Sequence, residues 1–211
     1  MEYVALILPG LATKGKSARI IEGSLHRIRE EGFDITTEKT DYVSHSGVCL
    51  EGFERDLVQM KRKIEALKLD HNRGKEIILV GICYGAYLAS RYLQENINNG
   101  SSGIHSAVFI EPYFGKESFR FPYKSLAELL AFTSGIFPSP KFPLGKRGGK
   151  SKTLNLTSLA EFICQEADLS KVETPILGIA TNYHHFFRRD KVLASLNQAK
   201  ANYTVLDCAN T

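Results

Sequence analysis

The stretch of sequence that decides the fold is Ile77-Ile78-Leu79-Val80-Gly81-Ile82-Cys83-Tyr84-Gly85. It begins with an uninterrupted run of branched apolar side chains, which is typical of a buried strand. Apolar residues recur at helical spacing after Gly85, so the chain passes from strand to helix through Cys83. A sharp turn of this kind lifts one side chain above the end of a sheet, and it needs small residues two positions before and two positions after that side chain. Gly81 and Gly85 meet this requirement.

On both sides of this turn, apolar runs alternate with segments of helical periodicity, which predicts a mostly parallel central sheet of about six strands flanked by helices. A length of 211 residues, 43% of them hydrophobic, suits one domain over residues 1–211 with a core that needs no disulfide bonds. The strands are expected at residues 3–8, 33–38, 76–80, 107–110, 175–180 and 203–207. The helices are expected around residues 18–28, 53–67, 86–93 and 192–199.

Residues 115–170 interrupt the alternation, because this segment is too long for a single crossover helix between two strands. An apolar helix is expected at residues 125–133, and a segment rich in proline and glycine follows it. The segment is either a surface insertion or a small cap over an active site, and we favour the cap because long insertions in compact domains are usually functional or disordered. A solvated loop is expected to carry its basic cluster, which consists of Lys141, Lys146, Arg147, Lys150 and Lys152.

Charge and composition argue against several classes of protein. The chain has 27 Lys and Arg against 23 Asp and Glu, and this excess of +4 is weaker than a nucleic-acid-binding protein normally shows. We expect no membrane span, because no run of about 18 apolar residues occurs, and the first residues lack the basic start of a secretory signal. The four cysteines form no C-x-x-C pair and no metal-like spacing, which predicts a reducing, cytoplasmic location and no metal site.

Cys83 is the candidate nucleophile of the turn. Its place at the start of a helix favours the thiolate form, because the helix dipole stabilises negative charge there. The backbone N–H of Tyr84 is a candidate donor to an oxyanion, and the loop after the first strand offers a second donor, the N–H of Leu11. The same pattern also fits a buried cysteine at a tight turn, without a chemical role.

The chain resembles the α/β-hydrolase superfamily over nearly its whole length. The resemblance rests on the Leu8-Pro9-Gly10 turn, the elbow at Cys83, the insertion, and residues 168–177, which read Asp-Leu-Ser-Lys-Val-Glu-Thr-Pro-Ile-Leu. It implies the α/β-hydrolase fold with a small cap insertion and without the first two strands of larger members. The cysteine at the elbow is similar to that of the dienelactone hydrolase branch. The resemblance implies a small-molecule acyl or lactone substrate and no metal or organic cofactor.

Two residues of the usual triad are missing from their expected places. The family's acid is an Asp shortly after the strand at 175–180, but here no carboxylate follows that strand before Asp190. The family's base is a His after the last strand, and no His lies between that strand and Thr211. A polypeptide that continues beyond Thr211 is one explanation that we consider for the missing base.

Other side chains near these places offer replacements. His184 or His185 could supply the base, and either one could instead be a plain loop residue at the rim of a pocket. Glu111 follows the fourth strand and could orient such a histidine, or it could be a salt-bridge or capping residue. Asp190 could play the same part, although a surface ion pair within Arg188-Arg189-Asp190-Lys191 is the simpler interpretation.

The leading prediction is hydrolysis of an ester, thioester or lactone through nucleophilic attack by Cys83. The alternative is a catalytically inactive protein of the same fold that binds a small apolar ligand or a protein partner, and the missing Asp and His support it. A further alternative is a class I glutamine amidotransferase, whose cysteine sits on a similar elbow. Those enzymes usually have Gln at the place of Tyr87 and a late His-x-Glu, and this sequence has neither.

Overall fold

The central feature of the computed structural model is a six-stranded sheet in the order β2-β1-β3-β4-β7-β8, in which every neighbouring pair is parallel. Its strands are β1 (Glu2–Leu8), β2 (Ile35–Lys39), β3 (Lys75–Ile82), β4 (Ile104–Ile110), β7 (Ile176–Thr181) and β8 (Asn202–Leu206). The structure describes residues 2–10, 16–32, 34–39, 53–70, 75–96, 103–133, 141–147, 150–155, 163–181, 187–199 and 201–206.

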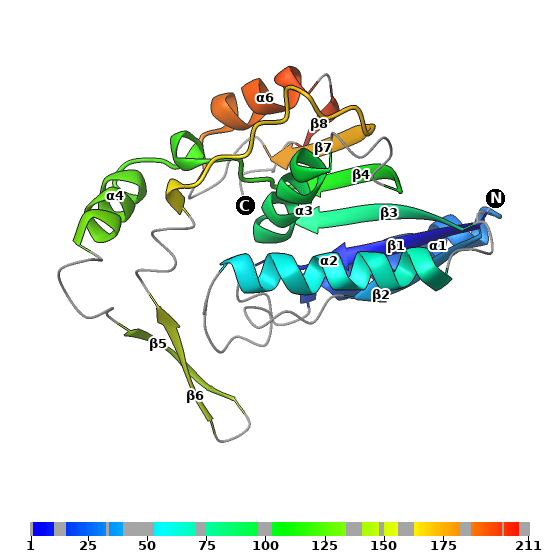
Figure 1. Ribbon diagram of the computed structural model, residues 1–211, viewed down its shortest axis with the longest axis horizontal. Helices are drawn as coiled ribbons and strands as arrows, with labels where there is room; N and C mark the ends of the chain where they lie inside the picture. The colour runs from blue at the N-terminus through cyan, green and yellow to red at the C-terminus, as the bar shows by residue number, and fades with distance from the viewer. Residues whose placement is uncertain are drawn as a thin grey trace.

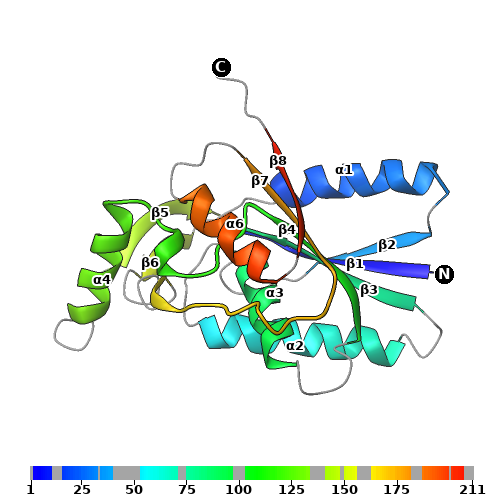
Figure 2. The same cartoon turned by 90° about the horizontal axis from the view of Figure 1, so that it is seen from above.

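Helices cover both faces of the sheet (Figure 2). One face carries α1 (Lys16–Glu30), and the other carries α2 (Phe53–Asp70), α3 (Tyr84–Glu95) and α6 (Arg189–Gln198). The side chains of β1 divide between the two layers, as alternation along a strand requires. Leu6 and Leu8 pack with α2 and α3, whereas Ala5 and Ile7 pack with α1.

The predicted elements of the sheet and its helices are confirmed. All six strands occur, with ends within three residues of the expected ones. The clearest predicted helix, α2, buries the apolar side that its sequence spacing indicates, because residues three and four positions apart share one face of a helix. The buried side chains of that face are Leu57, Met60, Ile64 and Leu67.

The order of the strands reverses between β1 and β3, since β2 lies on one side of this pair and β4, β7 and β8 lie on the other. The carboxyl ends of all six parallel strands point to one edge of the sheet (Figure 1). In open parallel sheets, ligands bind outside the carboxyl ends of the strands at such a reversal. The turn that contains Cys83 follows β3 at this point.

Between β4 and β7 the chain forms η2 (Lys116–Ser118), α4 (Tyr123–Thr133), β5 (Lys141–Arg147) and β6 (Lys150–Asn155). The expectation of a solvated loop for the basic cluster is wrong, because β5 and β6 pair as an antiparallel hairpin. The sequence between the two strands is Gly148-Gly149, a pair that two-residue hairpin turns favour, and this signal could have predicted the hairpin. None of the helices in the described part of the chain has the length and apolar character needed to cross a bilayer.

Candidate active site

Cys83 occupies a strained turn between β3 and α3. Its φ of 49° and ψ of −107° lie in a region that residues with a side chain rarely adopt. Two backbone hydrogen bonds hold it there: the Cys83 N–H donates to the carbonyl of Ile110 at 2.9 Å, and the Cys83 carbonyl accepts from the N–H of Tyr87 at 3.2 Å. The turn is therefore tied both to the end of β4 and to the first turn of α3.

The glycines on either side of Cys83 allow the strand, the turn and the helix to approach closely. A Cβ atom on Gly85 would lie 1.9 Å from the carbonyl oxygen of Leu8, at the end of β1. A Cβ atom on Gly81 would lie 2.5 Å from the Cα atom of Ala86. Because both obstacles are backbone atoms, no change of side-chain rotamer could relieve the overlap.

The Cys83 thiol is protonated at neutral pH in this environment. Burial has the largest effect on the pKa of this thiol and raises it, a hydrogen bond from the backbone N–H of Tyr84 lowers it, and the nearby negative charge of Glu111 raises it; together these effects bring the pKa to about 11. The expectation that the start of α3 favours a thiolate is therefore wrong for this structure, because desolvation outweighs the helix dipole. A base would have to remove the proton before Cys83 could attack a substrate.

Glu111 lies at the same edge of the sheet, directly after β4. Its φ of 47° is again unusual for a residue with a side chain. The Glu111 N–H donates to the carbonyl of Ile179 at 2.8 Å, and its Oε1 accepts a hydrogen bond of 2.7 Å from the N–H of Thr181. The carboxylate thus anchors the last residue of β7, from which the chain continues towards the two candidate histidines.

Leu11, His184 and His185 lie outside the residues that the structure describes. The segment that carries the histidines is nevertheless held on both sides, by Thr181 and by Phe187. Phe187 is buried, forms a β-bridge with Phe119, and accepts a hydrogen bond of 2.9 Å at its carbonyl from Nε of Arg120. These contacts hold Thr181 and Phe187, the described residues that flank the two histidines in the sequence.

Asp190 forms an ion pair at the surface of the protein. Its Oδ2 lies 2.8 Å from Nη2 of Arg188, and both side chains are exposed. This pair is the surface ion pair that the sequence favours for Asp190. A carboxylate paired in this way at the start of α6 is a weaker candidate than Glu111 for orienting a base.

An aromatic cluster that the sequence reasoning did not single out lies beside this edge. Tyr113, two residues after Glu111, has ring centroids of Tyr87, Phe119 and Phe187 within 5.2, 4.8 and 6.0 Å. Its hydroxyl donates to the carbonyl of Ile163, and burial raises the pKa of this hydroxyl above its ordinary value. The cluster joins the segment after β4 to the segments on either side of β7. Its only local sequence signal is the aromatic pair Tyr113-Phe114, which follows Pro112.

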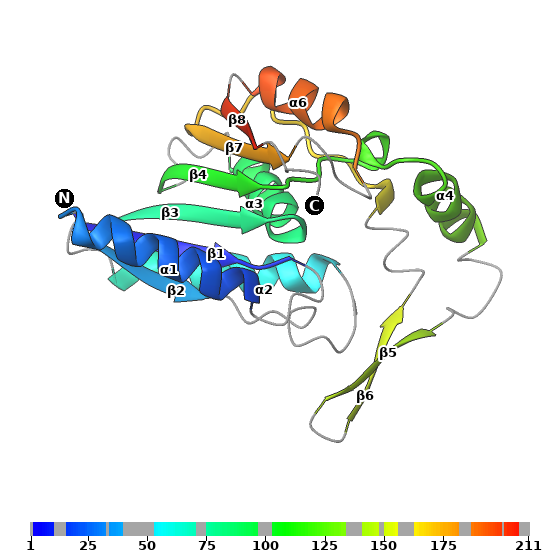
Figure 3. The ribbon, with the colours of Figure 1, turned by 180° about the vertical axis from the view of Figure 1, so that it is seen from behind.

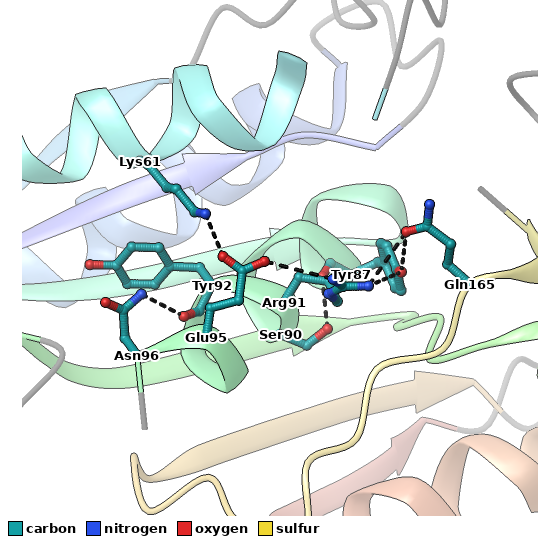
Figure 4. A network of polar contacts seen from close by, with 8 residues as sticks. All are labelled: Lys61, Tyr87, Ser90, Arg91, Tyr92, Glu95, Asn96 and Gln165. Carbon is teal, nitrogen blue, oxygen red and sulfur yellow. Dashed lines mark hydrogen bonds and ion pairs between the residues drawn. The ribbon is translucent and has the colours of Figure 1, made fainter. Parts of the chain in front are cut away.

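A polar network holds α3 in position behind the turn (Figure 4). Nη1 of Arg91 lies 3.4 Å from both the Tyr87 hydroxyl and Oε1 of Gln165, and the Tyr87 hydroxyl donates to the same Gln165 oxygen at 3.2 Å. Arg91 also pairs with Glu95 at 3.7 Å, and Glu95 in turn accepts from Lys61 of α2. Helix α3, and with it the turn at Cys83, is therefore bound on both sides.

Solved structures share the fold of this chain. A monoglyceride lipase of Saccharomyces cerevisiae, solved with a substrate analogue, superposes with a TM-score of 0.70 at 11% identity, over 98% of this chain and 78% of that chain. The chain has the α/β-hydrolase fold. A structure of the metagenome-derived lipolytic enzymes LipS and LipT gives 0.65 at 15% identity, with 99% and 84% covered. A thermostable carboxyl esterase of Bacillus coagulans, solved with glycerol, gives 0.61 at 15% identity, with 98% and 81% covered.

No protein-family model matches the chain, and no curated protein matches its sequence. The structural neighbours therefore establish the fold, and the chemistry has to be argued from the site itself.

Proposed function

We propose that the chain hydrolyses an ester, thioester or lactone, with Cys83 as the nucleophile. The observation that carries the proposal is the conformation of Cys83: a strained turn at the carboxyl end of β3, with the N–H of Tyr84 directed at its sulfur. A strained backbone conformation persists only where the surrounding structure holds it in place, and such conformations are concentrated at active sites. The similarity in fold to lipases and esterases supports the reaction class.

The reaction would take place in two halves. A base removes the proton from the Cys83 thiol as the sulfur attacks the carbonyl carbon, so that a C–S bond forms and the carbonyl oxygen becomes an oxyanion. The N–H groups of Tyr84 and Leu11 are the proposed donors to that oxyanion. The intermediate then expels the alcohol or thiol, which takes the proton from the base, and leaves an acyl group on Cys83. Water, activated by the same base, releases the acid and restores the thiol.

His184 or His185 is the proposed base, and Glu111 is the proposed residue that orients it. The raised pKa of Cys83 makes a base necessary, because little thiolate exists at neutral pH. Glu111 already binds the N–H of Thr181, three residues before His184. The short sequence separation supports the idea that the carboxylate and a histidine of this segment act together.

We propose that residues 115–170 act as a cap and that an apolar acyl or lactone part of the substrate lies against it. Figure 3 shows α4 and the β5–β6 hairpin beyond the carboxyl ends of the strands. This is the edge of the sheet at which Cys83 and Glu111 lie.

Hydrolysis of p-nitrophenyl esters and acyl thioesters of increasing chain length tests the proposal, with Cys83→Ala and Cys164→Ala as a matched pair. Cys164 is also a free cysteine of intermediate exposure, but it lies outside the turn. Activity that disappears in Cys83→Ala and persists in Cys164→Ala supports the nucleophile. Activity that persists in both variants would refute it.

The second candidate function is a non-catalytic binding protein with this fold, and the high pKa of the Cys83 thiol favours it. Acyl transfer to the sulfur separates the two functions. Incubation with a p-nitrophenyl ester, followed by mass spectrometry of the intact protein, would show an added acyl group on a nucleophilic Cys83. A binding protein would show no added mass.

A further inference from the structure

Helix α4, together with Phe121 two residues before it, leaves large apolar side chains in solvent. We call Phe121, Leu126, Leu129 and Phe132 the apolar stripe, and these side chains are 84%, 54%, 59% and 78% exposed. Leu126, Leu129 and Phe132 are spaced three residues apart, so they follow one another along the surface of the helix. Single exposed leucines are ordinary on a protein surface, but a continuous apolar stripe indicates an interaction site.

The charged residues of α4 explain which side of the helix faces the domain. Lys124 pairs with Glu117 at 2.5 Å, and Glu128 pairs with Lys116 at 3.9 Å, so both ionic contacts join α4 to η2. At 3.6 residues per turn, Leu126 lies about 200° around the helix axis from Lys124. Leu129 lies about 140° from Lys124, so Leu126 and Leu129 are presented away from the contacts that attach the helix, whereas Phe132 lies at the border of that face, about 80° from Lys124.

The hairpin that follows α4 has a local excess of positive charge. Between residues 129 and 160 the sequence has five Lys and Arg and no Asp or Glu, which exceeds the net +4 of the whole chain. We call β5 and β6 the basic hairpin, and its cations are Lys141, Lys146, Arg147, Lys150 and Lys152. Figures 1 and 3 show the basic hairpin and α4 extending from the same side of the domain.

We propose that the apolar stripe and the basic hairpin bind the surface of an anionic lipid membrane. Apolar side chains enter the boundary between headgroups and acyl chains, while lysines and arginines are attracted to anionic headgroups. A nucleic acid would attract the hairpin but leave the apolar stripe in water. A second copy of the chain would bring two strongly basic hairpins together, so charge complementarity favours the lipid surface.

Co-sedimentation with vesicles tests this proposal. The protein should sediment with vesicles of equal parts phosphatidylcholine and phosphatidylglycerol, and much less with phosphatidylcholine alone. Binding should weaken as salt is raised, because exposed charges are screened over about 8 Å at physiological ionic strength. Equal binding to both kinds of vesicle, or binding to neither, would overturn the proposal.

Two pairs of variants locate the surface. Leu129→Ser should lower the partition coefficient about tenfold, since an apolar side chain no longer enters the membrane. Its control is Leu69→Ser on α2, which removes a leucine that is even more exposed (75%) and should leave binding unchanged. Equal losses in the two variants would contradict the assignment of the apolar stripe.

The triple variant Lys146→Gln/Arg147→Gln/Lys150→Gln should lose about fivefold in binding for each charge removed. The control triple Arg62→Gln/Lys171→Gln/Arg189→Gln removes the same charge from exposed positions on α2, before β7 and on α6. It should bind within about twofold of the unmodified chain, because distant charges are screened. If the first triple variant does not fold, Lys150→Gln alone should show the fivefold loss.

Three further outcomes separate this proposal from others. Self-association that Leu129→Ser abolishes, without vesicle binding, would show that a second copy covers the apolar stripe. Tight binding to a DNA or RNA duplex, without vesicle binding, would assign the basic hairpin to a nucleic acid. Cys83→Ala should bind vesicles like the unmodified chain, so the membrane proposal and the proposed hydrolysis stand or fall separately.

Discussion

The hydroxyl of Tyr84 donates a hydrogen bond of 2.7 Å to Oδ2 of Asp56, and both residues are buried. Tyr84 directly follows Cys83, and its N–H is the proposed donor to the oxyanion. Asp56 lies on α2, so this contact fixes the ring of Tyr84 from a neighbouring helix. Asp56 is therefore a positioning residue for the turn, acting through Tyr84.

Replacing Tyr84 with Phe should lower the free energy of unfolding by about 1–3 kcal/mol, because the buried Asp56 carboxylate loses a donor. It should also lower kcat on p-nitrophenyl esters more than it raises KM, because the backbone of residue 84 is less well held. Urea unfolding and steady-state kinetics measure the two effects. Tyr92→Phe, which removes a hydroxyl bonded to Lys68, is the matched control and should leave kcat unchanged.

Replacing Gly85 with Ala should destabilise the fold by more than about 3 kcal/mol, because the new Cβ would overlap the backbone of Leu8. Gly23→Ala is the control, since nothing lies within 4 Å of its Cβ position on α1. It should stabilise the fold by up to about 1 kcal/mol, as alanine favours the helix. Thermal or urea unfolding compares the two, and similar midpoints would contradict the close packing at the turn.

Alkylation of Cys83 with iodoacetamide should show a midpoint near pH 11, as burial raises the pKa of its thiol to about 11. Peptide mass spectrometry distinguishes Cys83 from the other cysteines. A midpoint at or below the ordinary value of 9.0 would contradict the desolvation argument.

The same pKa makes stability depend on pH. Between the ordinary value of 9.0 and about 11, the unfolded chain releases the Cys83 proton while the folded chain retains it. The stabilisation is therefore complete below pH 9 and is lost as pH rises towards 11, by roughly 2 kcal/mol. Urea unfolding of the unmodified chain and Cys83→Ala at both ends of this range measures the difference. A constant difference between them would contradict the prediction.

Replacing Glu111 with Gln should separate the effect of its charge on the pKa of Cys83 from its hydrogen bond to the N–H of Thr181. Removing the negative charge should lower the pKa of Cys83 and speed its alkylation at pH 9, while the amide oxygen can still accept from the N–H of Thr181. If Glu111 orients the catalytic base, kcat should nevertheless fall at least about tenfold. Asp190→Asn should change neither quantity, and an unchanged kcat in Glu111→Gln would remove Glu111 from the mechanism.

The turn at Cys83 could be predicted because its signal is local. The apolar run, the glycines and the helical spacing all lie within about one strand and one helix of each other. The basic hairpin was missed because its prolines and glycines dominate the composition, although Gly148-Gly149 is typical of a hairpin turn. The aromatic cluster around Tyr113 was missed because its members come from three segments that are far apart in the sequence: α3, the segment after β4 and the segment after β7.

The sequence by itself determined that the fold has a mostly parallel central sheet, in which order strands and helices follow one another along the chain, and that Cys83 lies at the carboxyl ends of the strands. Those features follow from periodicity and from the conformations that glycine permits, which are properties of neighbouring residues. Only the tertiary structure decided that Cys83 is held as a thiol, that Glu111 anchors Thr181 and that Asp56 holds Tyr84. The contact of Glu111 with Thr181 joins residues 70 positions apart, and the contact of Asp56 with Tyr84 joins residues 28 positions apart. The pKa of Cys83 depends on how far distant segments exclude water from its sulfur. None of these features can be read from spacing along the chain.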